Sequence, residues 1–331
     1  MMEESDLVLV SGASGFVACH VVQQLQQAGY RVRGTVRSLK NEAKVKPIRE
    51  LCPDAAHPIE LVEADLLDAD SWPKAVEGCT YVIHTASPVA LGPVDEEPLI
   101  KGALGGTLNV LEAVKATSSV KRVVLTSSTV AVSGGMAVPD ASYSEKDFPD
   151  PMTTEMDPYS KSKILAERAA WDFVKGASFE LAVVNPSFIV GPPLHSGEGL
   201  STNIIKGLID GSQEIMPIIF PCVDVRDVAR AHVAAMTTKD AAGHRHCLNT
   251  EGFWCSDIAQ MLKDEFGGQG YSVTKRTETP SAKPPHFDTT RMRSVLGINP
   301  IPIRKSLVDM GYRIIEMGLL PKTEKYRGQK I

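Results

Sequence analysis

The sequence predicts an α/β protein built on a doubly wound parallel sheet, with a smaller C-terminal lobe. Short β-branched runs alternate with amphipathic helical patterns through the first half of the chain. The first of these runs leads into a glycine-rich turn that opens a helix. Strict alternation of strands and helices requires parallel strands joined by crossover helices, which then cover both faces of the sheet.

The first strand is expected at Leu7–Val10, an apolar run that ends at Ser11-Gly12. The helix over residues 16–28 follows, with apolar residues at helical spacing and Gly29 as its C-cap. Further strands are expected at Arg31–Val36, Ile59–Glu63, Tyr81–Thr85, Arg122–Thr126 and Glu180–Asn185, and helices at 71–77, 98–116 and 159–175.

Beyond residue 186 the pattern loosens, and prolines interrupt the tail. Helices are expected at 202–211, 224–237, 256–266 and 304–318, and short strands near 216–220, 245–249 and 271–275. No segment has the composition of a free linker. The C-terminal part is therefore expected to form a small lobe over the sheet edge.

Composition narrows the class of protein. The 331 residues carry 35 Lys+Arg against 40 Asp+Glu, a net charge of −5, which argues against a general nucleic-acid binder. No apolar run approaches the roughly 20 residues that a membrane span needs, and the acidic start does not resemble a signal peptide. The six cysteines show no CxxC spacing, so we expect reduced thiols, no metal site and a cytoplasmic location.

The strongest local signal is the segment Ser11–Ala18, directly after the first strand. Gly12 permits a tight turn, Gly15 lets the backbone approach a pyrophosphate, and Ala18 lets the helix pack closely on the strand. The amides at the helix N-terminus would then face the phosphates. A plain glycine turn is the alternative, but the strand–turn–helix context favours a dinucleotide site of the Rossmann type.

The end of the second strand indicates which dinucleotide binds. NAD sites usually carry an Asp or Glu there for the ribose 2′-hydroxyl. This chain has Arg37, with Lys44 seven residues later. Two cations suit a 2′-phosphate through charge-assisted hydrogen bonds, so we expect NADPH; two solvated surface cations are the alternative.

Two further strand ends offer contacts to the cofactor. Asp65 follows the third strand and could accept a hydrogen bond from the adenine amino group. Thr85, Ala86 and Ser87 end the fourth strand, where small side chains let the ribose approach. Helix capping is the alternative role for these positions, because Asp and Ser favour N-caps.

Tyr159 and Lys163 lie four residues apart at the start of a predicted helix, so both side chains can enter one cleft. A tyrosine has a reference pKa near 10 and needs a nearby cation to act as an acid–base group at neutral pH. The spacing alone is common. It gains weight from the preceding strand, which ends in Ser127-Ser128, because ligands bind beyond the carboxyl ends of parallel strands.

Together, Gly12-x-x-Gly15-x-x-Ala18, Ser127-Ser128 and Tyr159-x-x-x-Lys163 resemble the extended short-chain dehydrogenase/reductase superfamily. Further stretches are similar to its dihydroflavonol 4-reductase branch, which includes cinnamoyl-CoA reductases and NADPH-dependent carbonyl and methylglyoxal reductases. These stretches are Thr35–Arg37, His84–Pro88, Gly106–Ala113, Ala166–Trp171, Asn185–Pro192 and Val223–Ala229.

The resemblance implies a role for each motif residue. Ser128 would polarise the substrate carbonyl, Tyr159 would donate the proton, and Lys163 would hold the ribose and lower the tyrosine pKa. Arg37 and Lys44 would take the 2′-phosphate. The expected cofactor contacts are Gly12, Ser14, Gly15, Phe16, Val17, Arg37, Lys44, Asp65, Leu66, Thr85, Ala86, Ser87, Thr126, Ser127, Tyr159, Lys163, Pro186 and Ser187.

The resemblance also implies a division of the chain and a reaction. Residues 5–185 would form the NADP-binding Rossmann core, and residues 186–331 mainly a substrate-binding lobe, with some segments returning to the sheet. The expected activity is reduction of an aldehyde or ketone to an alcohol, by an oxidoreductase acting on CH–OH groups as a monomer or homodimer. A nucleotide-sugar epimerase or dehydratase and a non-catalytic NADP-binding regulator are the alternatives.

Departures from relatives leave the substrate unassigned. Epimerases and dehydratases tend to carry Asn where this chain has Ala103. Plant cinnamoyl-CoA reductases usually differ before the catalytic tyrosine, where Asp157-Pro158 stand here, and plant dihydroflavonol reductases typically have Asn or Asp at the place of Ser133. The sequence therefore predicts a carbonyl reductase and not its particular substrate.

Several conspicuous residues are expected to be structural. His84 should pack within its strand, His244–His246 should form a solvated strand end, and Cys222 should be a small buried side chain. Asp224 and Arg226 should form an ion pair that braces the cleft entrance. The loop 133–158 is long enough to shape the pocket or to act as a lid.

Overall fold

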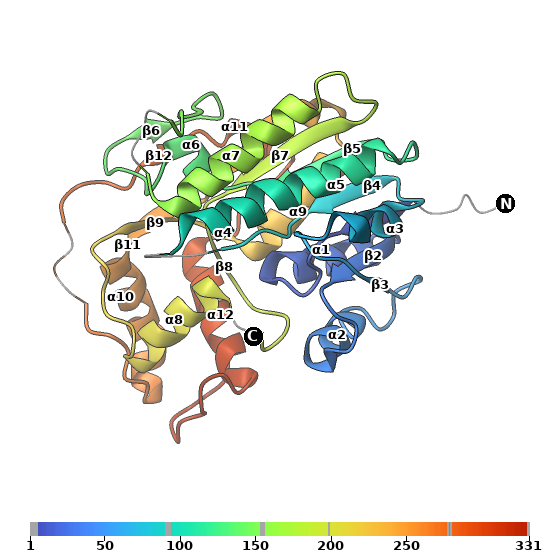
Figure 1. The fold of residues 1–331 in the computed structure, drawn as a ribbon. Helices are drawn as coiled ribbons and strands as arrows, with labels where there is room; N and C mark the ends of the chain where they lie inside the picture. Colours follow the sequence, from blue (N-terminus) through green and yellow to red (C-terminus); the bar gives the residue numbers. More distant parts are fainter. Residues whose placement is uncertain are drawn as a thin grey trace.

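The computed structural model describes residues 6–89, 94–152, 156–197, 199–276, 278 and 280–329. Its centre is a seven-stranded parallel sheet in the order β10-β7-β5-β4-β1-β2-β3 (Figure 1). The strands are β1 (Leu7–Val10), β2 (Arg31–Val36), β3 (Glu60–Glu63), β4 (Tyr81–His84), β5 (Arg122–Thr126), β7 (Glu180–Pro186) and β10 (Arg245–Leu248). The predicted doubly wound sheet is confirmed.

Helices cover both faces of this sheet. One layer contains α1 (Phe16–Gln27) and α9 (Val225–Thr237), and the other contains α3 (Trp72–Val76), α5 (Gly106–Lys115) and α7 (Pro158–Phe173). Val8 and Val10 of β1 belong to the core under α1 and α9, whereas Leu7 and Leu9 belong to the core under α3, α5 and α7. Since side chains alternate along a strand, burial on both faces explains the unbroken apolar run.

Two helical segments differ from the expected pattern. Helix α2 (Glu42–Arg49) was not expected, because it contains Pro47 and only Val45 and Ile48 are buried. The helix expected over 98–116 begins earlier, as α4 (Glu96–Ile100), and passes through a π-helical turn at Lys101–Gly105 before α5.

The smaller lobe contains a three-stranded sheet of β11 (Glu251–Trp254), β9 (Ile219–Asp224) and β8 (Phe188–Val190). It shares a separate core with α8 (Leu200–Asp210), α10 (Cys255–Phe266) and α12 (Ile303–Glu316) (Figure 1). The remaining elements are α6 (Val130–Ser133), β6 (Ser142–Tyr143), β12 (His286–Phe287) and α11 (Thr290–Ser294), with 3-10 turns at Ala69–Ser71, Lys239–Ala241 and Gly267–Gln269.

Three expectations about the C-terminal half are wrong. Residues 271–275 form no strand, since the Thr274 amide donates to the Leu208 carbonyl at the end of α8. The strand expected near 216–220 lies later, at Ile219–Asp224, and the short strands β8 and β11 that flank it were not expected. His244–His246 is not a solvated strand end: Arg245 is 8% exposed and His246 is fully buried.

Two bulk properties follow from the described residues. None of the helices there has the length and apolar character that crossing a membrane would require. All six cysteines are free thiols, and five of them are buried.

Candidate active site

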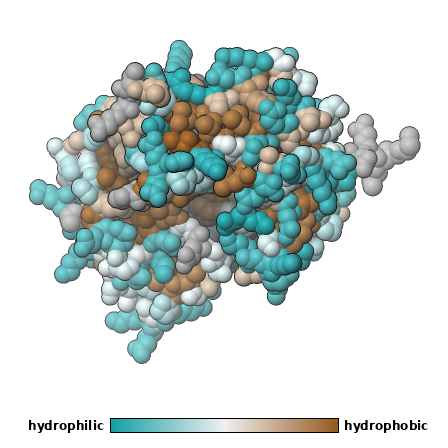
Figure 2. Space-filling model, viewed as in Figure 1, coloured by the Kyte–Doolittle hydropathy of each residue, from teal (hydrophilic) through white to brown (hydrophobic). Residues whose placement is uncertain are grey.

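A cavity of about 1620 Å³ lies where the carboxyl ends of the sheet strands meet the smaller lobe. Figure 2 shows a recess near the centre of this face, bordered by apolar residues. Every catalytic and cofactor-binding residue expected from the sequence lines this cavity. Ser38 and Asn41, which the sequence analysis did not select, line it as well.

The glycine turn gives the cavity one of its walls. Gly12 has a φ of +65°, and a Cβ there would lie 3.0 Å from the Ala86 Cβ. The Gly15 amide donates to the Gly12 carbonyl at 2.8 Å, and Gly15 is the N-cap of α1 without a side-chain cap. The turn is therefore closed tightly by residues that leave the first amides of α1 available to a ligand.

Ser11 connects the glycine turn to the end of β4 by hydrogen bonds, a role that the sequence did not predict. Its hydroxyl oxygen accepts from the amides of Thr85 (3.0 Å) and Ala86 (2.9 Å) and lies 2.8 Å from the His84 Nδ1. The hydroxyl hydrogen is thus directed at His84, whose Nδ1 accepts. Burial lowers the pKa of His84 to about 3, so this ring is neutral and structural, as its strand position predicts.

Arg37 and Lys44 line the same cavity as the glycine turn. Arg37 directly follows β2, and Lys44 comes from the unexpected helix α2. Both side chains are exposed, both line the cavity, and neither forms an ion pair with any residue that the structure describes. The neighbouring strand β3 ends in an acid, Glu63, whose carboxylate accepts a hydrogen bond from the Leu39 amide at 2.7 Å.

Asp65 and Leu66 line the same part of the cavity from the end of β3. Asp65 does not cap a helix, which excludes the alternative role: its carboxylate accepts from the Leu67 amide at 2.9 Å in a local turn. The Asp65 carbonyl accepts from the Trp72 indole at 2.9 Å. This pairing fixes the backbone of the turn beside the cavity.

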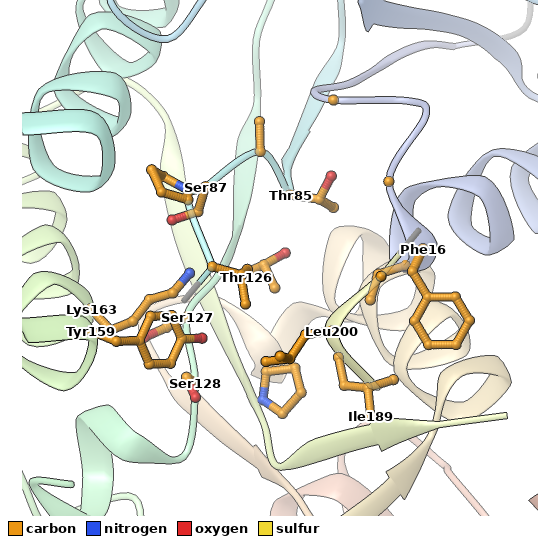
Figure 3. A pocket seen from close by; sticks show the side chains of 18 of the residues that line it. Phe16, Thr85, Ser87, Thr126, Ser127, Ser128, Tyr159, Lys163, Ile189 and Leu200 are labelled. Carbon is orange, nitrogen blue, oxygen red and sulfur yellow. The ribbon is translucent and has the colours of Figure 1, made fainter. Parts of the chain in front are cut away.

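The three expected catalytic residues lie together. Figure 3 shows Ser128, Tyr159 and Lys163 gathered on one side of the cavity, across from Phe16 and Ile189. The Ser128 and Tyr159 hydroxyls lie close together in this view, and the Lys163 ammonium lies 5.6 Å from the Tyr159 ring centre. This arrangement can present two hydroxyl groups to one oxygen atom of a substrate.

Helix α7 begins where it must to place Tyr159 in the cavity. Asp157 is its N-cap and accepts from the Ser160 amide at 3.0 Å, while Pro158 occupies the first helical position. Both residue types favour a helix start. The expected helix over 159–175 therefore forms, beginning one residue and ending two residues earlier than predicted.

Burial determines the charge state of this pair. It raises the pKa of Tyr159 to about 12, although the nearby Ser128 hydroxyl lowers it in part. It lowers the pKa of Lys163 to about 8, and the carboxylate of Glu167 opposes that shift. At neutral pH the tyrosine is thus a protonated acid, and the lysine is mostly an ammonium.

Thr126, Ser127, Pro186 and Ser187 form the floor of the cavity. The hydroxyl of Ser127 donates to Glu167 at 2.6 Å, and that of Thr126 lies 2.7 Å from the ring of the buried His232. Ser187 differs, because its buried hydroxyl has no hydrogen-bond partner in the part of the chain that is described.

The remaining structural expectations concern the second lobe. Cys222 is fully buried, as expected, and does not line the cavity. Asp224 and Arg226 form the expected ion pair at 2.7 Å, and Arg226 also contacts Asp309 of α12 at 2.8 Å. The expected pocket-shaping loop contributes Ser133, Gly135, Met136 and Ala137 to the cavity wall.

Comparisons with known proteins agree with this geometry. The sequence profile of the NAD dependent epimerase/dehydratase family matches residues 8–250. Cinnamoyl-CoA reductase 1 of Oryza sativa subsp. japonica is 37% identical over 327 residues, covering 96% of this chain and 93% of the rice protein.

Solved structures with the same fold include two Gre2 proteins in complex with NADPH. Yeast methylglyoxal/isovaleraldehyde reductase Gre2 complexed with NADPH aligns with a TM-score of 0.82 at 27% identity, covering 94% of this chain and 99% of its own. Gre2 from Candida albicans in complex with NADPH aligns with a TM-score of 0.81 at 30% identity and the same coverages.

The sheet, the glycine turn and the Ser–Tyr–Lys cluster define an extended short-chain dehydrogenase/reductase. The chain belongs to the NAD dependent epimerase/dehydratase family and is an NAD(P)-dependent reductase within it, similar to the cinnamoyl-CoA and Gre2 reductases. The family resemblance of the sequence motifs is thereby confirmed.

Proposed function

We propose that this protein reduces an aldehyde or ketone to an alcohol with NADPH. The observation that carries the proposal is the grouping of the Ser128 and Tyr159 hydroxyls beside Lys163 in one large cavity. Two hydroxyl donors that converge on one point can stabilise the alkoxide that develops as a carbonyl is reduced. The relatives named above, which are reductases, support the same reaction class.

The residues present fit the cofactor. The absence of a side chain at Gly12 lets the turn close against Ala86, and the first amides of α1, which no side chain caps, suit a pyrophosphate. The unpaired hydroxyl of Ser187 suits a polar group at the nicotinamide end. Arg37 and Lys44 would hold the 2′-phosphate that distinguishes NADPH from NADH.

Each catalytic residue has a distinct task in this mechanism. NADPH, when bound, supplies the hydride. Tyr159 donates its proton to the substrate oxygen, which its raised pKa allows at neutral pH. Ser128 orients the carbonyl by a second hydrogen bond, and the Lys163 ammonium favours the phenolate that remains after the transfer.

The substrate side of the cavity supports an uncharged carbonyl compound. Its walls there are mostly apolar, with hydroxyls from Ser133 and Ser201. Of the cations that line the cavity, Arg37 and Lys44 belong to the adenosine side and Lys163 to the catalytic cluster. The free thiols favour the cytoplasm, and a monomer or homodimer is proposed.

Removal of the Tyr159 hydroxyl tests the proposed reaction. Tyr159→Phe keeps the ring and should reduce turnover with NADPH by roughly two to four decades, while NADPH binding is retained. NADPH oxidation is measured against aldehydes, α-dicarbonyls and aromatic ketones. Unchanged turnover on an accepted substrate would remove Tyr159 from the mechanism, and tight NADPH binding without any turnover would favour a regulator.

A further inference from the structure

A fully buried carboxylate lies directly behind the catalytic cluster. Glu167 is one helical turn beyond Lys163 on α7 and has no exposed surface. It accepts hydrogen bonds from four side chains, which come from α7, β7, β10 and the residue that follows β5. The donors are Ser127 Oγ (2.6 Å), Asn185 Nδ2 (2.9 Å), Trp171 Nε1 (3.2 Å), and Arg245 Nε (2.5 Å) and Nη2 (3.3 Å).

Burying an ion pair is costly, so its presence calls for a reason beyond stability. Glu167 and Arg245 are exposed by 0% and 8%, and both oxygens of the carboxylate are used. Two apolar side chains of the same volume often stabilise a protein at least as much as a buried ion pair does. A fixed pair of opposite charges, however, also imposes a field on any ionisable group beside it.

Lys163 is the ionisable group beside this pair. Residues four apart on a helix have Cβ atoms about 5–6 Å from one another, so Glu167 stands next to Lys163. Arg245 approaches from β10, on the far side of Glu167. Of the two charges, the carboxylate is therefore nearer to the lysine and the guanidinium is farther away.

Other charges around Lys163 are remote, neutral or exposed. His84 of β4 is neutral because burial lowers its pKa to about 3, and Asp157 faces Tyr159 at the start of α7. Helix α6 carries no charged residue. The elements that pack on the outer side of α7 carry their charges only at exposed positions: Glu96, Glu97, Lys101, Glu112 and Lys115.

We propose that the Glu167–Arg245 pair sets the protonation state of Lys163, Glu167 favouring the ammonium and Arg245 moderating that preference. Both are positioning residues, since neither lines the cavity. The proposal rests on the proposed function in one respect, because Lys163 is taken there as part of the reductase site. It gives a function to a buried charged pair for which the sequence motifs indicate none.

The two members of the pair should act in opposite directions. Burial lowers the pKa of Lys163 to about 8, and Glu167 opposes that shift. Without the carboxylate, burial and the remaining guanidinium both disfavour the ammonium, so the pKa of Lys163 falls further. Without the guanidinium, the carboxylate acts unopposed and the pKa rises.

The experiment compares Glu167→Gln with Arg245→Met. Turnover with NADPH and an accepted carbonyl is measured from pH 6 to 10. The alkaline limb should move to lower pH in Glu167→Gln, by roughly one unit, and to higher pH in Arg245→Met. Limbs that stay in place, or that move in the same direction in both variants, would overturn the proposal, because general structural damage produces no opposite shifts.

Two further variants isolate the charge from the packing. Arg168 and Arg245 both stack on the Phe148 ring, at 4.4 and 4.2 Å, and both donate to carbonyls of the loop at 145–149. Only Arg245 contacts Glu167. Arg168→Gln and the charge-retaining Arg245→Lys should therefore leave the alkaline limb where it is; a shift in Arg168→Gln equal to that in Arg245→Met would contradict the proposal.

A second readout does not depend on turnover. In protein labelled with ¹³C-lysine, the Lys163 side-chain resonance can be assigned with Lys163→Arg and titrated directly by NMR. The same opposite shifts are expected there. If the parent protein reduces no carbonyl, the proposed function fails while this titration still decides the inference; if Glu167→Gln does not fold, the contrast between Arg245→Met and Arg245→Lys decides it.

Discussion

At the scale of single residues, Arg37 and Lys44 are unusual in an acidic chain. Both cations are exposed, both line the cavity, and neither is paired with an acid in the described part of the protein. A paired cation would have to exchange one partner for another when a phosphate binds. An unpaired cation loses only its hydration, so more of the free energy of the charge-assisted hydrogen bond contributes to binding.

We predict that Arg37→Ala weakens NADPH binding by about tenfold to a hundredfold, since a hydrogen bond to a charged group contributes roughly 1.5–3 kcal/mol. NADH binding should change little. Fluorescence titration with both nucleotides measures the two dissociation constants. Arg49→Ala is the matched control, because Arg49 is an exposed cation of the nearby helix α2 that does not line the cavity; equal losses for NADPH and NADH in Arg37→Ala would mean that Arg37 does not bind the 2′-phosphate.

The site residues differ in how far the sequence reveals them. Tyr159 and Lys163 are separated by one helical turn, so the pattern that predicts the helix also brings them together. Glu167 depends on Arg245, which lies 78 residues away, and Ser11 contacts Thr85 across 74 residues. The periodicity of apolar residues within a segment does not indicate such pairs, because only the order of strands in the sheet makes these residues neighbours.

At the scale of elements, strands were expected at both 245–249 and 271–275, and only the first forms, as β10. Both segments are short and contain polar and apolar residues. The first pairs with the edge of β7, and its polar residues are buried with partners: Arg245 donates to the Asp147 carbonyl of a distant loop, and His246 contacts the Val183 carbonyl of β7. The second finds no strand edge and packs instead beside α8. Alternation predicts a strand only where a partner edge exists.

The start of α7 gives a prediction at this scale. Asp157→Ala removes the N-cap of the helix that carries Tyr159 and should lower the free energy of unfolding by about 1 kcal/mol. Asp157→Ser retains a capping oxygen and should recover most of that loss. Urea unfolding followed by circular dichroism measures both. Equal destabilisation by Ala and Ser would show that capping is not what Asp157 contributes.

At the scale of the whole molecule, buried histidines tie stability to pH. Burial lowers the pKa values of His20, His232 and His246 to about 4 and that of His84 to about 3. They come from different parts of the chain, in α1, β4, α9 and β10. Each is neutral in the folded protein and regains its ordinary pKa, about 6.5, when the chain unfolds.

The unfolded chain therefore binds more protons between these values, and acid favours it. We predict that the free energy of unfolding is level above pH 7 and falls from about pH 6.5 towards pH 4, by up to about 1.4 kcal/mol per pH unit for each histidine. Urea titrations at pH 7.5, 6.0 and 5.0 measure this slope. A stability that is unchanged from pH 7.5 to 5.0 would contradict the burial of these rings as neutral groups.

The place of β10 in the main sheet also affects how the protein is made. Strand β7 ends at Pro186, yet its outer neighbour begins only at Arg245, after β8, α8 and β9 of the smaller lobe and helix α9. During synthesis the edge of β7 stays uncovered until about sixty more residues have been added. An uncovered strand edge favours pairing with other chains. A fragment that stops after β7 is thus expected to aggregate, and chaperones have most to protect in that interval of translation.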